Sequence, residues 1–356
     1  MSTKEFLIWQ SSFHPDSSKE SQDEMRETFI SQRHSLGLDS LKKCAQITQG
    51  LKKNVVSDEL INILTPHSEE SYAVFDDPIF EIWLSFLHRA AAKGREEEVF
   101  LHCVNLTSVL KRVEMRINGK EQRYLLGTKI PIQQNDLDPY LMAATPPSYD
   151  FIEALQSEDE ISNQGHPVEL QTELLGLALK SIGNAWPEMK GQIIEFVKII
   201  GYLPRATFRS CSASRYPGVI YIGNMDESIL DIEESMVHEA GHQVLYRLAE
   251  LTPLTKPNTS QAAEYELPWS GSKRDLFGFF HAFYIYALLA KYFWRRALVG
   301  DHNSRDARKR SILILMGMRL AEPMLKSDSN LSEQGRIILD QLCNDMDILE
   351  ENLLNI

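Results

Sequence analysis

The chain has 356 residues, of which 43% are apolar and 24% charged, and its formal net charge at pH 7 is -13. This is the composition of an ordinary globular protein, and the length allows one large domain or two average ones. Binding to a phosphate backbone needs a concentrated basic face, which this acidic chain does not show, so nucleic acid is not expected as a partner.

Cysteine usage and the first residues bear on the compartment. The four cysteines are too widely spaced for a CxxC metal site or a dense disulfide framework, which favours a reducing compartment. They are Cys44, Cys103, Cys211 and Cys343. Residues 1–21 lack a basic start followed by an apolar core, so no secretory signal is expected. We therefore predict a cytoplasmic protein.

The first half of the chain is predicted to be mainly helical. Residues 18–50 are polar and helix-prone, residues 78–94 form an amphipathic helix ending at a glycine, and residues 95–113 read as its partner. After them, apolar and polar residues alternate around an Asn-Gly pair. This pattern predicts a β-hairpin near 113–126.

A polar, acidic stretch at 156–167 is the most plausible domain boundary. It separates an N-terminal, mainly helical region with the hairpin, residues 1–160, from a C-terminal domain, residues 161–356. Two helices are expected to open the second part, at about 168–183 and 187–201. Neither part shows an internal repeat.

Two short strands are expected near 207–223, around a Pro-Gly turn. A helix then begins near Asp231, and the most apolar run of the chain follows at 276–294. That run carries His281 and Lys291, so it is expected to be a buried helix and not a membrane span. The sequence thus predicts an α+β protein that is predominantly α-helical with a small β component.

The stretch MVHEAGHQVLYRLAEL, residues 236–251, holds an HExxH motif in the predicted core helix. His238 and His242 are four apart, so they share one helix face and can bind one metal ion from the same side. Glu239 is near enough to reach a metal-bound water. Gly241 indicates close packing, because glycine within a helix costs about 1 kcal/mol relative to alanine. Alternatively, the two histidines arose by chance and merely pack.

A catalytic metal site also needs a third ligand and an open position. Leu245 and Leu248 stand where the metzincin pattern requires glycine and histidine, which excludes that class. Glu264 and Glu266 are placed at a workable distance for a thermolysin-like site, but their segment reads as a loop. His281 is the remaining candidate, and the alternative is a core histidine bonded within the fold.

Two basic residues precede the apolar helix in the segment LPWSGSKRDLFG. Arg274 lies seven residues before His281, and a guanidinium there is suited to holding a carboxylate in a bidentate grip. Lys273 offers an ammonium at the same step. The alternative for both is a surface cation at the start of a helix.

These residues together resemble the HExxH-motif proteins found in bacterial gene clusters for ribosomally made, post-translationally modified peptides. That family is viewed as iron- and 2-oxoglutarate-dependent peptide β-hydroxylases. The resemblance runs from about Cys211 to the C-terminus and rests on five elements in order. They are SASRYPGVIYI, HEAGHQVLYRLAELTPL, LPWSGSKRDLFG, FFHAFYIYALLAKYFWRR and LSEQG.

The resemblance implies Fe(II) and not zinc, with His238, His242 and His281 at the positions that match the metal site. A basic residue of the Lys273-Arg274 step would hold 2-oxoglutarate, and the substrate would be a precursor peptide hydroxylated at a side-chain β-carbon. Glu239 would orient a ligand or a water. The N-terminal region matches the family less clearly and is expected to help bind the peptide.

Two competing interpretations remain at this point. One is a zinc metallopeptidase in which Glu239 is the general base for a zinc-bound water. The other is a non-catalytic binding or maturation partner in which the helix site is structural. Neither the modified residue type nor the oligomeric state follows from the sequence.

Overall fold

The computed structural model describes residues 19–50, 61–62, 64–65, 68–121, 123–134, 137–142 and 166–354. Its helices are α2 (Lys19–Gly50), α4 (Glu69–Phe75), α5 (Pro78–Ala92), α6 (Glu96–Ile117), α7 (Pro139–Met142), α9 (Val168–Ala185), α10 (Pro187–Phe196), α11 (Ile229–Leu251), α12 (Leu276–Leu298), α13 (Ser304–Ser327) and α14 (Glu333–Leu354). Its strands are β1 (Ile132–Gln133), β2 (Ile199–Tyr202), β3 (Ser210–Cys211), β4 (Val219–Ile222), β5 (Tyr265–Glu266) and β6 (Lys273–Arg274). The protein is α+β and predominantly helical, which confirms the predicted class.

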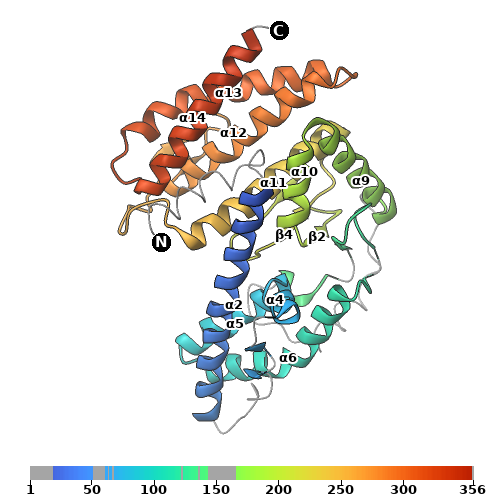
Figure 1. Cartoon of the computed structure of the whole chain (residues 1–356), viewed down its shortest axis with the longest axis vertical. Coiled ribbons are helices and arrows are strands. Elements are labelled where there is room, and N and C mark those ends of the chain that lie inside the picture. Colours follow the sequence, from blue (N-terminus) through green and yellow to red (C-terminus); the bar gives the residue numbers. More distant parts are fainter. Residues whose placement is uncertain are drawn as a thin grey trace.

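A four-stranded sheet lies between two groups of helices (Figure 1). Its order is β1-β2-β4-β3, with parallel pairs between β1, β2 and β4 and an antiparallel pair between β4 and β3. Ile132 of β1 pairs with Ile200 of β2, so a strand from before the predicted boundary completes a sheet from after it. The boundary at 160 lies outside the described residues and stays a prediction.

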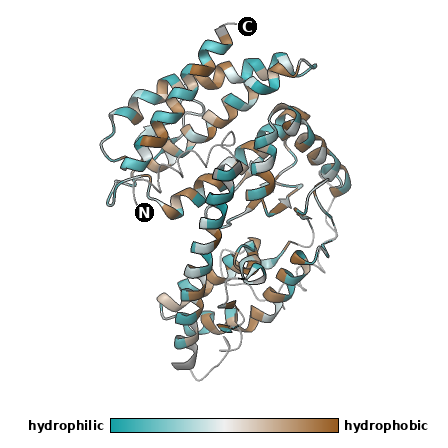
Figure 2. Cartoon of the chain, viewed as in Figure 1, coloured by the Kyte–Doolittle hydropathy of each residue, from teal (hydrophilic) through white to brown (hydrophobic). Residues whose placement is uncertain are grey.

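The two faces of this sheet belong to two different hydrophobic cores. On β4, Ile220 and Ile222 pack into the core formed mainly by α9 to α14, whereas Val219 and Tyr221 pack into the core formed mainly by α2, α5 and α6. This follows from the alternation of side chains along a strand. In Figure 2 hydrophobic and hydrophilic residues alternate along the ribbons of the helices.

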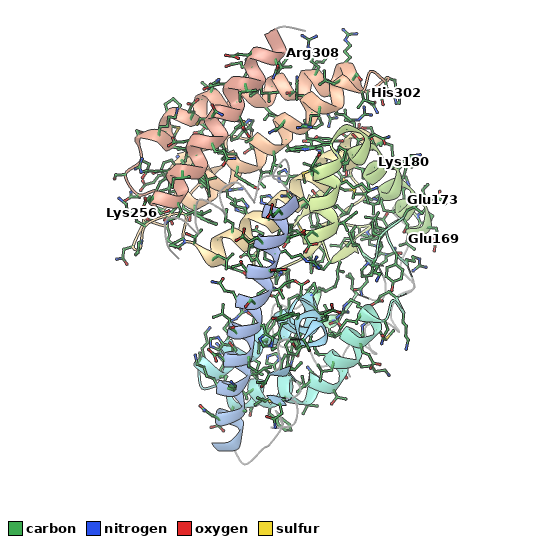
Figure 3. All side chains as sticks on the ribbon, in the orientation of Figure 1. Glu169, Glu173, Lys180, Lys256, His302 and Arg308 are labelled. Atoms are coloured by element: carbon green, nitrogen blue, oxygen red, sulfur yellow. The ribbon has the colours of Figure 1, made fainter. Side chains whose placement is uncertain are left out.

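Helix α9 shows this polarity in its charged side chains. Glu169, Glu173 and Lys180 are exposed on the outer side of the helix (Figure 3). Leu175 and Leu179, on its other side, are fully or almost fully buried in the larger core. The spacing of the two sets gives the helix one apolar stripe, as expected for a surface helix.

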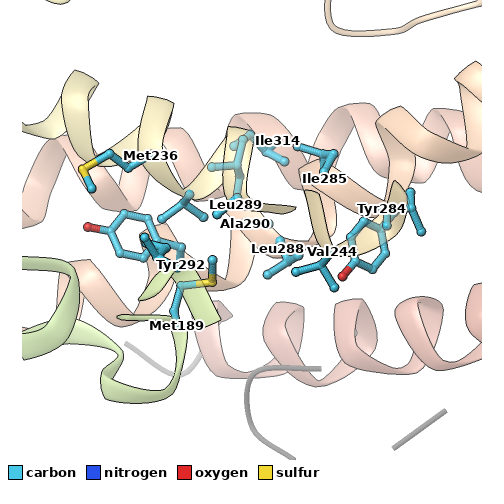
Figure 4. Close-up of a cluster of buried hydrophobic side chains, with 14 of the residues drawn as sticks. Met189, Met236, Val244, Tyr284, Ile285, Leu288, Leu289, Ala290, Tyr292 and Ile314 are labelled. Carbon is cyan, nitrogen blue, oxygen red and sulfur yellow. The ribbon is translucent and has the colours of Figure 1, made fainter. Parts of the chain in front are cut away.

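The apolar run at 276–294 forms most of α12, which is buried in the larger core as predicted. Asp275 caps it by accepting a 2.8 Å hydrogen bond from Gly278 N. It is the single candidate membrane span found in the part of the chain that the structure describes, and 72% of its apolar window is buried inside the protein. Figure 4 shows Ile285, Leu288 and Leu289 of α12 packed among side chains of α10, α11 and α13.

The motif helix α11 starts slightly earlier than predicted, because Ser228 caps it by accepting a hydrogen bond from Asp231 N. Its middle packs tightly against α12. A Cβ added to Gly241 would lie 2.9 Å from Ile285 Cδ1, so the glycine allows the close approach that its position predicted. Helix α11 is therefore in the core, with one side turned toward a partly open region.

The β-hairpin expected near 113–126 was wrong. No hairpin forms at the Asn-Gly pair: α6 continues to Ile117, and Gly119, with φ at 64°, follows its C-cap Asn118. A glycine with positive φ ends a helix as readily as it makes a hairpin turn. Nearby, Tyr124 and Pro131 form only an isolated antiparallel bridge.

The helix expected at 187–201 ends at Phe196, and the apolar residues after it form β2 instead. A short apolar run is compatible with either structure, and here pairing with β1 and β4 decides for a strand. The short strands expected near 207–223 are confirmed. They are β3 and β4, and Gly218, with φ at 73°, precedes β4.

A charged cluster ties the N-terminal helices to the end of α11. Arg247 of α11 donates two hydrogen bonds, of 3.2 and 3.0 Å, to the carboxylate of Glu81 on α5. Arg33 of α2 also pairs with Glu81, and with Glu250 of α11 at 3.2 Å. Burial raises the pKa of Glu81 well above its usual range, opposed by Arg33. The motif helix is thus anchored to both halves of the molecule.

Candidate functional site

Helices α11 and α12 bring the three predicted histidines into one cluster. The ring centroids of His238 and His242 are 4.7 Å apart, and those of His242 and His281 are 4.4 Å apart. His238 and His242 are half-buried, whereas His281 is only 7% exposed. The spacing of four residues on α11 and the crossing of α12 at Gly241 produce this arrangement.

Within the cluster, two imidazoles contact each other directly. Nδ1 of His242 lies 2.6 Å from Nε2 of His281. Two nitrogens bound to one tetrahedral ion would be roughly 3.4 Å apart, given metal–nitrogen distances of about 2.0–2.1 Å. In this arrangement, no group of three His, Cys, Asp or Glu side chains among the described residues could hold a metal ion. Metal binding would require the rings to rotate apart.

The chemistry of the three side chains nevertheless fits a metal. Burial, followed by the nearby His238 and His281, lowers the pKa of His242 well below its usual range. Burial, followed by His238, lowers the pKa of His281 to about 3. Both imidazoles are therefore neutral at pH 7, and a neutral imidazole offers a lone pair to a metal. The donor set fits a metal, and the ligand assignment stays a prediction.

Aromatic side chains surround the histidines on both helices. Tyr246, one turn after His242, is edge-on to His281 with centroids 4.9 Å apart. Tyr286 of α12 is edge-on to His238 at 6.3 Å, and Trp269 stacks on Tyr286 at 4.1 Å. Trp269 belongs to the PW segment of the sequence, so that segment forms a wall beside the cluster.

Glu239 lies on the sheet side of α11, where two serines hold it. Oγ of Ser210 donates to Oε1 and Oγ of Ser212 donates to Oε2, each at 2.7 Å. The side chain is only 2% exposed. Burial, together with the Glu239 carboxylate, raises the pKa of Tyr246 to about 12, opposed by a hydrogen bond with Ser212. Both carboxylate oxygens are thus engaged with β3 and its continuation.

These two serines are functional candidates that sequence reasoning missed. Their alternation in the segment RSCSAS was a usable signal, since residues two apart on a strand share one face. Gln243, one turn after Glu239, was also missed. Its side chain is fully buried; it accepts from Gly218 N at 2.7 Å and donates to Val219 O at 2.8 Å. Together, Glu239 and Gln243 fix the β3–β4 hairpin to the motif helix.

Arg274 and Lys273 are exposed and form β6, outside the helix that carries His281. The Arg274 side chain folds over the start of α12: a Cβ at Gly278 would lie 3.3 Å from both its Cβ and its Cδ. Gly278 is one turn before His281. In the described ranges Arg274 makes no ion pair, and its guanidinium donates to Lys273 O at 3.0 Å. It therefore retains donors for an anion.

The two carboxylates considered as a third metal ligand, Glu264 and Glu266, lie on or beside β5 and not in the histidine cluster. Glu264 and Glu266 are both exposed, and Glu266 pairs with Lys273 across the β5–β6 ladder.

A comparison with protein-family models finds no match for this chain. A comparison with curated proteins finds none either. The function must therefore be inferred from the residues themselves.

The late LSEQG segment packs against the end of the motif helix. Oγ of Ser332 donates to Pro253 O at 2.7 Å. A Cβ on Gly335 would lie 2.2 Å from Leu254 O, so only glycine fits at this contact. Ser332 also accepts from Gly335 N at 2.9 Å. Two sequence elements about 80 residues apart thus meet just after the C-terminal end of α11.

Proposed function

We propose that this protein is a metal-dependent peptide-modifying enzyme. The proposed activity is that of an Fe(II)- and 2-oxoglutarate-dependent dioxygenase that hydroxylates a side-chain β-carbon in a ribosomal precursor peptide. The observation that carries the proposal is the contact cluster of His238, His242 and His281, formed by two packed helices and partly open to solvent. The resemblance of the five sequence elements supplies the reaction class.

In this proposal the three imidazoles hold the metal. Because the pKa values of His242 and His281 are lowered, neither ring carries a charge that would repel a cation. Three neutral ligands leave the full charge of the ion, which favours an anionic chelating cosubstrate. Bound there, Fe(II) with 2-oxoglutarate and dioxygen would supply the oxidant for carbon hydroxylation: one oxygen atom would enter the peptide and the other succinate, with release of carbon dioxide.

The residues around the histidines have roles that follow from their contacts. Arg274 is the better candidate of the two basic residues for holding a 2-oxoglutarate carboxylate, because a planar guanidinium makes bidentate bonds that an ammonium cannot. The stacked Trp269 and Tyr286 are proposed to limit the access of water to His238. The N-terminal helices are proposed to help bind the peptide.

The position of Glu239 favours this activity over a zinc metallopeptidase. A peptidase base must take a proton from metal-bound water, and its carboxylate has to reach that water. Both oxygens of Glu239 accept 2.7 Å hydrogen bonds from serines of the sheet. In our proposal Glu239 positions α11 against β3 and takes no proton from the substrate.

The setting of this activity is proposed to be the cytoplasm. The apolar helix α12 is buried within the fold, and the cysteines that the structure describes, Cys103, Cys211 and Cys343, are free thiols. Free thiols fit a reducing compartment. Neither a membrane nor nucleic acid belongs to the proposal, since the net charge is -13.

The direct test is an anaerobically prepared Fe(II) protein mixed with 2-oxoglutarate, a precursor peptide encoded beside the gene, and then oxygen. We expect the peptide to gain the mass of one oxygen atom and succinate to form in equal amount. His281→Ala is the matched control and should lose both products. Peptide fragments in the presence of zinc would instead establish the peptidase, and absence of stoichiometric metal in purified protein would favour a non-catalytic partner.

A further inference from the structure

We propose that an extended peptide segment binds along the outer edge of β3, where it is held by the main chain of Ser210 and Ser212. This inference rests on the proposed function only for the identity of the peptide. The binding mode itself follows from the sheet, from the orientation of β3 and from its distance to the histidine cluster.

Strand β3 forms one border of the four-stranded sheet. On its inner side it pairs with β4, and none of the strands in the described ranges pairs with its outer side. Residues 207–215, which include β3, are exposed or half-buried throughout. A sheet edge carries a row of unpaired N–H and C=O groups, and these groups pair readily with an added strand.

The register shows which groups face outward. Gly223 N donates to Arg209 O at 2.7 Å, and Cys211 is the Cα partner of Tyr221. In an antiparallel pair, residues that exchange hydrogen bonds alternate with residues that do not. Arg209 and Cys211 therefore face β4, and the N–H and C=O groups of Ser210 and Ser212 point away from it, toward the open edge.

The same two serines keep this edge in place. Their hydroxyls donate to the two oxygens of Glu239, so the side chains are fixed on α11, and in the described ranges no other segment bonds to their outward main-chain groups. Gln243 holds the start of β4 one turn further along the helix. A preformed edge loses little entropy when a peptide binds, which is the condition for useful affinity from few hydrogen bonds.

The edge lies beside the histidine cluster. Tyr246 lies next to both: its ring is edge-on to His281, with centroids 4.9 Å apart, and Ser212 is among the groups close enough to affect its pKa. A peptide added to β3 would present every second side chain toward α11, as side chains alternate along a strand. One of these side chains would reach the cluster while its neighbours point away.

The charges around the edge indicate the chemistry of the peptide. Arg205 and Arg215 are exposed at the two ends of segment 205–215, which contains β3 and has no Asp or Glu. This is a basic setting in a chain whose net charge is -13. An extended peptide with acidic residues beside the modified position therefore fits better than a basic one.

The test is a scan of N-methylated peptides. The probes are synthetic precursor peptides encoded beside the gene, measured by titration calorimetry with the complete protein in the absence of oxygen. N-methylation removes one main-chain donor at a time. We expect affinity losses of roughly five- to tenfold at alternate residues, since one net hydrogen bond is worth about that factor. A flat scan would overturn the proposal, and so would failure of every probe to bind.

A pair of enzyme variants tests the same contact from the other side. Ser212→Ala removes the hydroxyl only, whereas Ser212→Pro also removes the outward N–H, and proline is tolerated where that group faces away from the sheet. We expect peptide affinity to fall by less than about threefold in the first variant and by roughly five- to tenfold in the second, since only the second removes a main-chain hydrogen bond. Equal affinities would contradict the edge contact. If Ser212→Pro does not fold, the N-methyl scan still decides.

Failure of this inference and failure of the proposed function give different results. Alternating losses in the scan, with no oxygen added to any peptide, would keep the edge site and remove the hydroxylase activity. If a peptide is hydroxylated but its N-methyl scan shows no alternation, the hydroxylase activity is supported and the peptide site on β3 is contradicted. Binding is measured without oxygen, so it does not depend on turnover.

Discussion

Nδ1 of His242 and Nε2 of His281 lie 2.6 Å apart, so the motif helix and the apolar helix meet through their imidazoles. Each histidine is held by the packing of its own helix. The pair therefore comes together only if α11 and α12 cross at Gly241 as they do. Substitution of a single histidine can separate the metal ligands from residues that only pack.

The first prediction concerns metal content. His238→Ala, His242→Ala and His281→Ala should each lose more than tenfold in Fe(II) or Co(II) affinity, since each would remove one of three ligands. The measurement is equilibrium metal binding followed by the Co(II) absorption spectrum. His102→Ala, a buried histidine outside the cluster, is the control and should bind metal normally. Normal binding by His281→Ala would exclude it as the third ligand.

The second prediction concerns Glu239. Glu239→Gln should keep metal affinity and peptide hydroxylation within about threefold, because an amide can still bond with both serine hydroxyls. The Ser210→Ala/Ser212→Ala double variant should be destabilised by about 1–3 kcal/mol, since it leaves a buried carboxylate without partners. Urea unfolding and succinate release measure the two effects. Complete loss of turnover in Glu239→Gln, with active serine variants, would instead indicate a catalytic base.

The third prediction concerns Trp269 and the wall beside the cluster. A Cβ on Gly317 of α13 would lie 2.3 Å from Trp269 Nε1, which donates to Ile314 O at 3.1 Å. Gly317→Ala should therefore displace the indole from Tyr286, destabilise the protein by about 1–3 kcal/mol and shift its tryptophan fluorescence. Gly191→Ala is the control, because nothing lies within 4 Å of its added Cβ. Similar stability of the two variants would contradict the contact.

The fourth prediction concerns pH and the buried His102. Burial lowers its pKa to about 4, whereas an unfolded chain has a histidine pKa of about 6.5. Between these values the unfolded state binds a proton that the folded state does not. Stability should therefore fall with decreasing pH, by up to about 1.4 kcal/mol per pH unit from this group.

The check is the difference between the parent protein and His102→Gln in urea unfolding at pH 7 and pH 5. The variant should lose less stability on acidification, because it has no imidazole to protonate. His242 and His281 contribute equally to both proteins, so the difference isolates His102. An identical pH dependence would show that His102 is protonated as easily in the folded state as in the unfolded one.

Local pattern was sufficient for the helices that shape the site. The apolar periodicity predicted α11 and α12, and Gly241 predicted the tight contact between them. The Asn-Gly pair misled because a glycine with positive φ suits both a turn and a helix end. The apolar residues of β2 misled because a short run of that kind does not distinguish a strand from a helix.

The contacts of Glu239 could not be predicted in the same way. Ser210 and Ser212 are 29 and 27 residues before it, and only the pairing of β3 with β4 turns their side chains toward α11. The way in which Arg274 approaches His281 could not be predicted from the sequence either. It does not continue the helix of His281; its side chain lies over the first turn of that helix from β6.

The short strand β1 has a consequence for any fragment of this protein. Pro131 O accepts a 3.0 Å hydrogen bond from Ile200 N, and the face of the sheet with Val219 and Tyr221 packs against the N-terminal helices. A fragment that begins at residue 161 would lack β1, so the edge of β2 would be unpaired and an apolar surface would be exposed. Both features favour aggregation. The histidine helix and the N-terminal helices must therefore be expressed together in one chain.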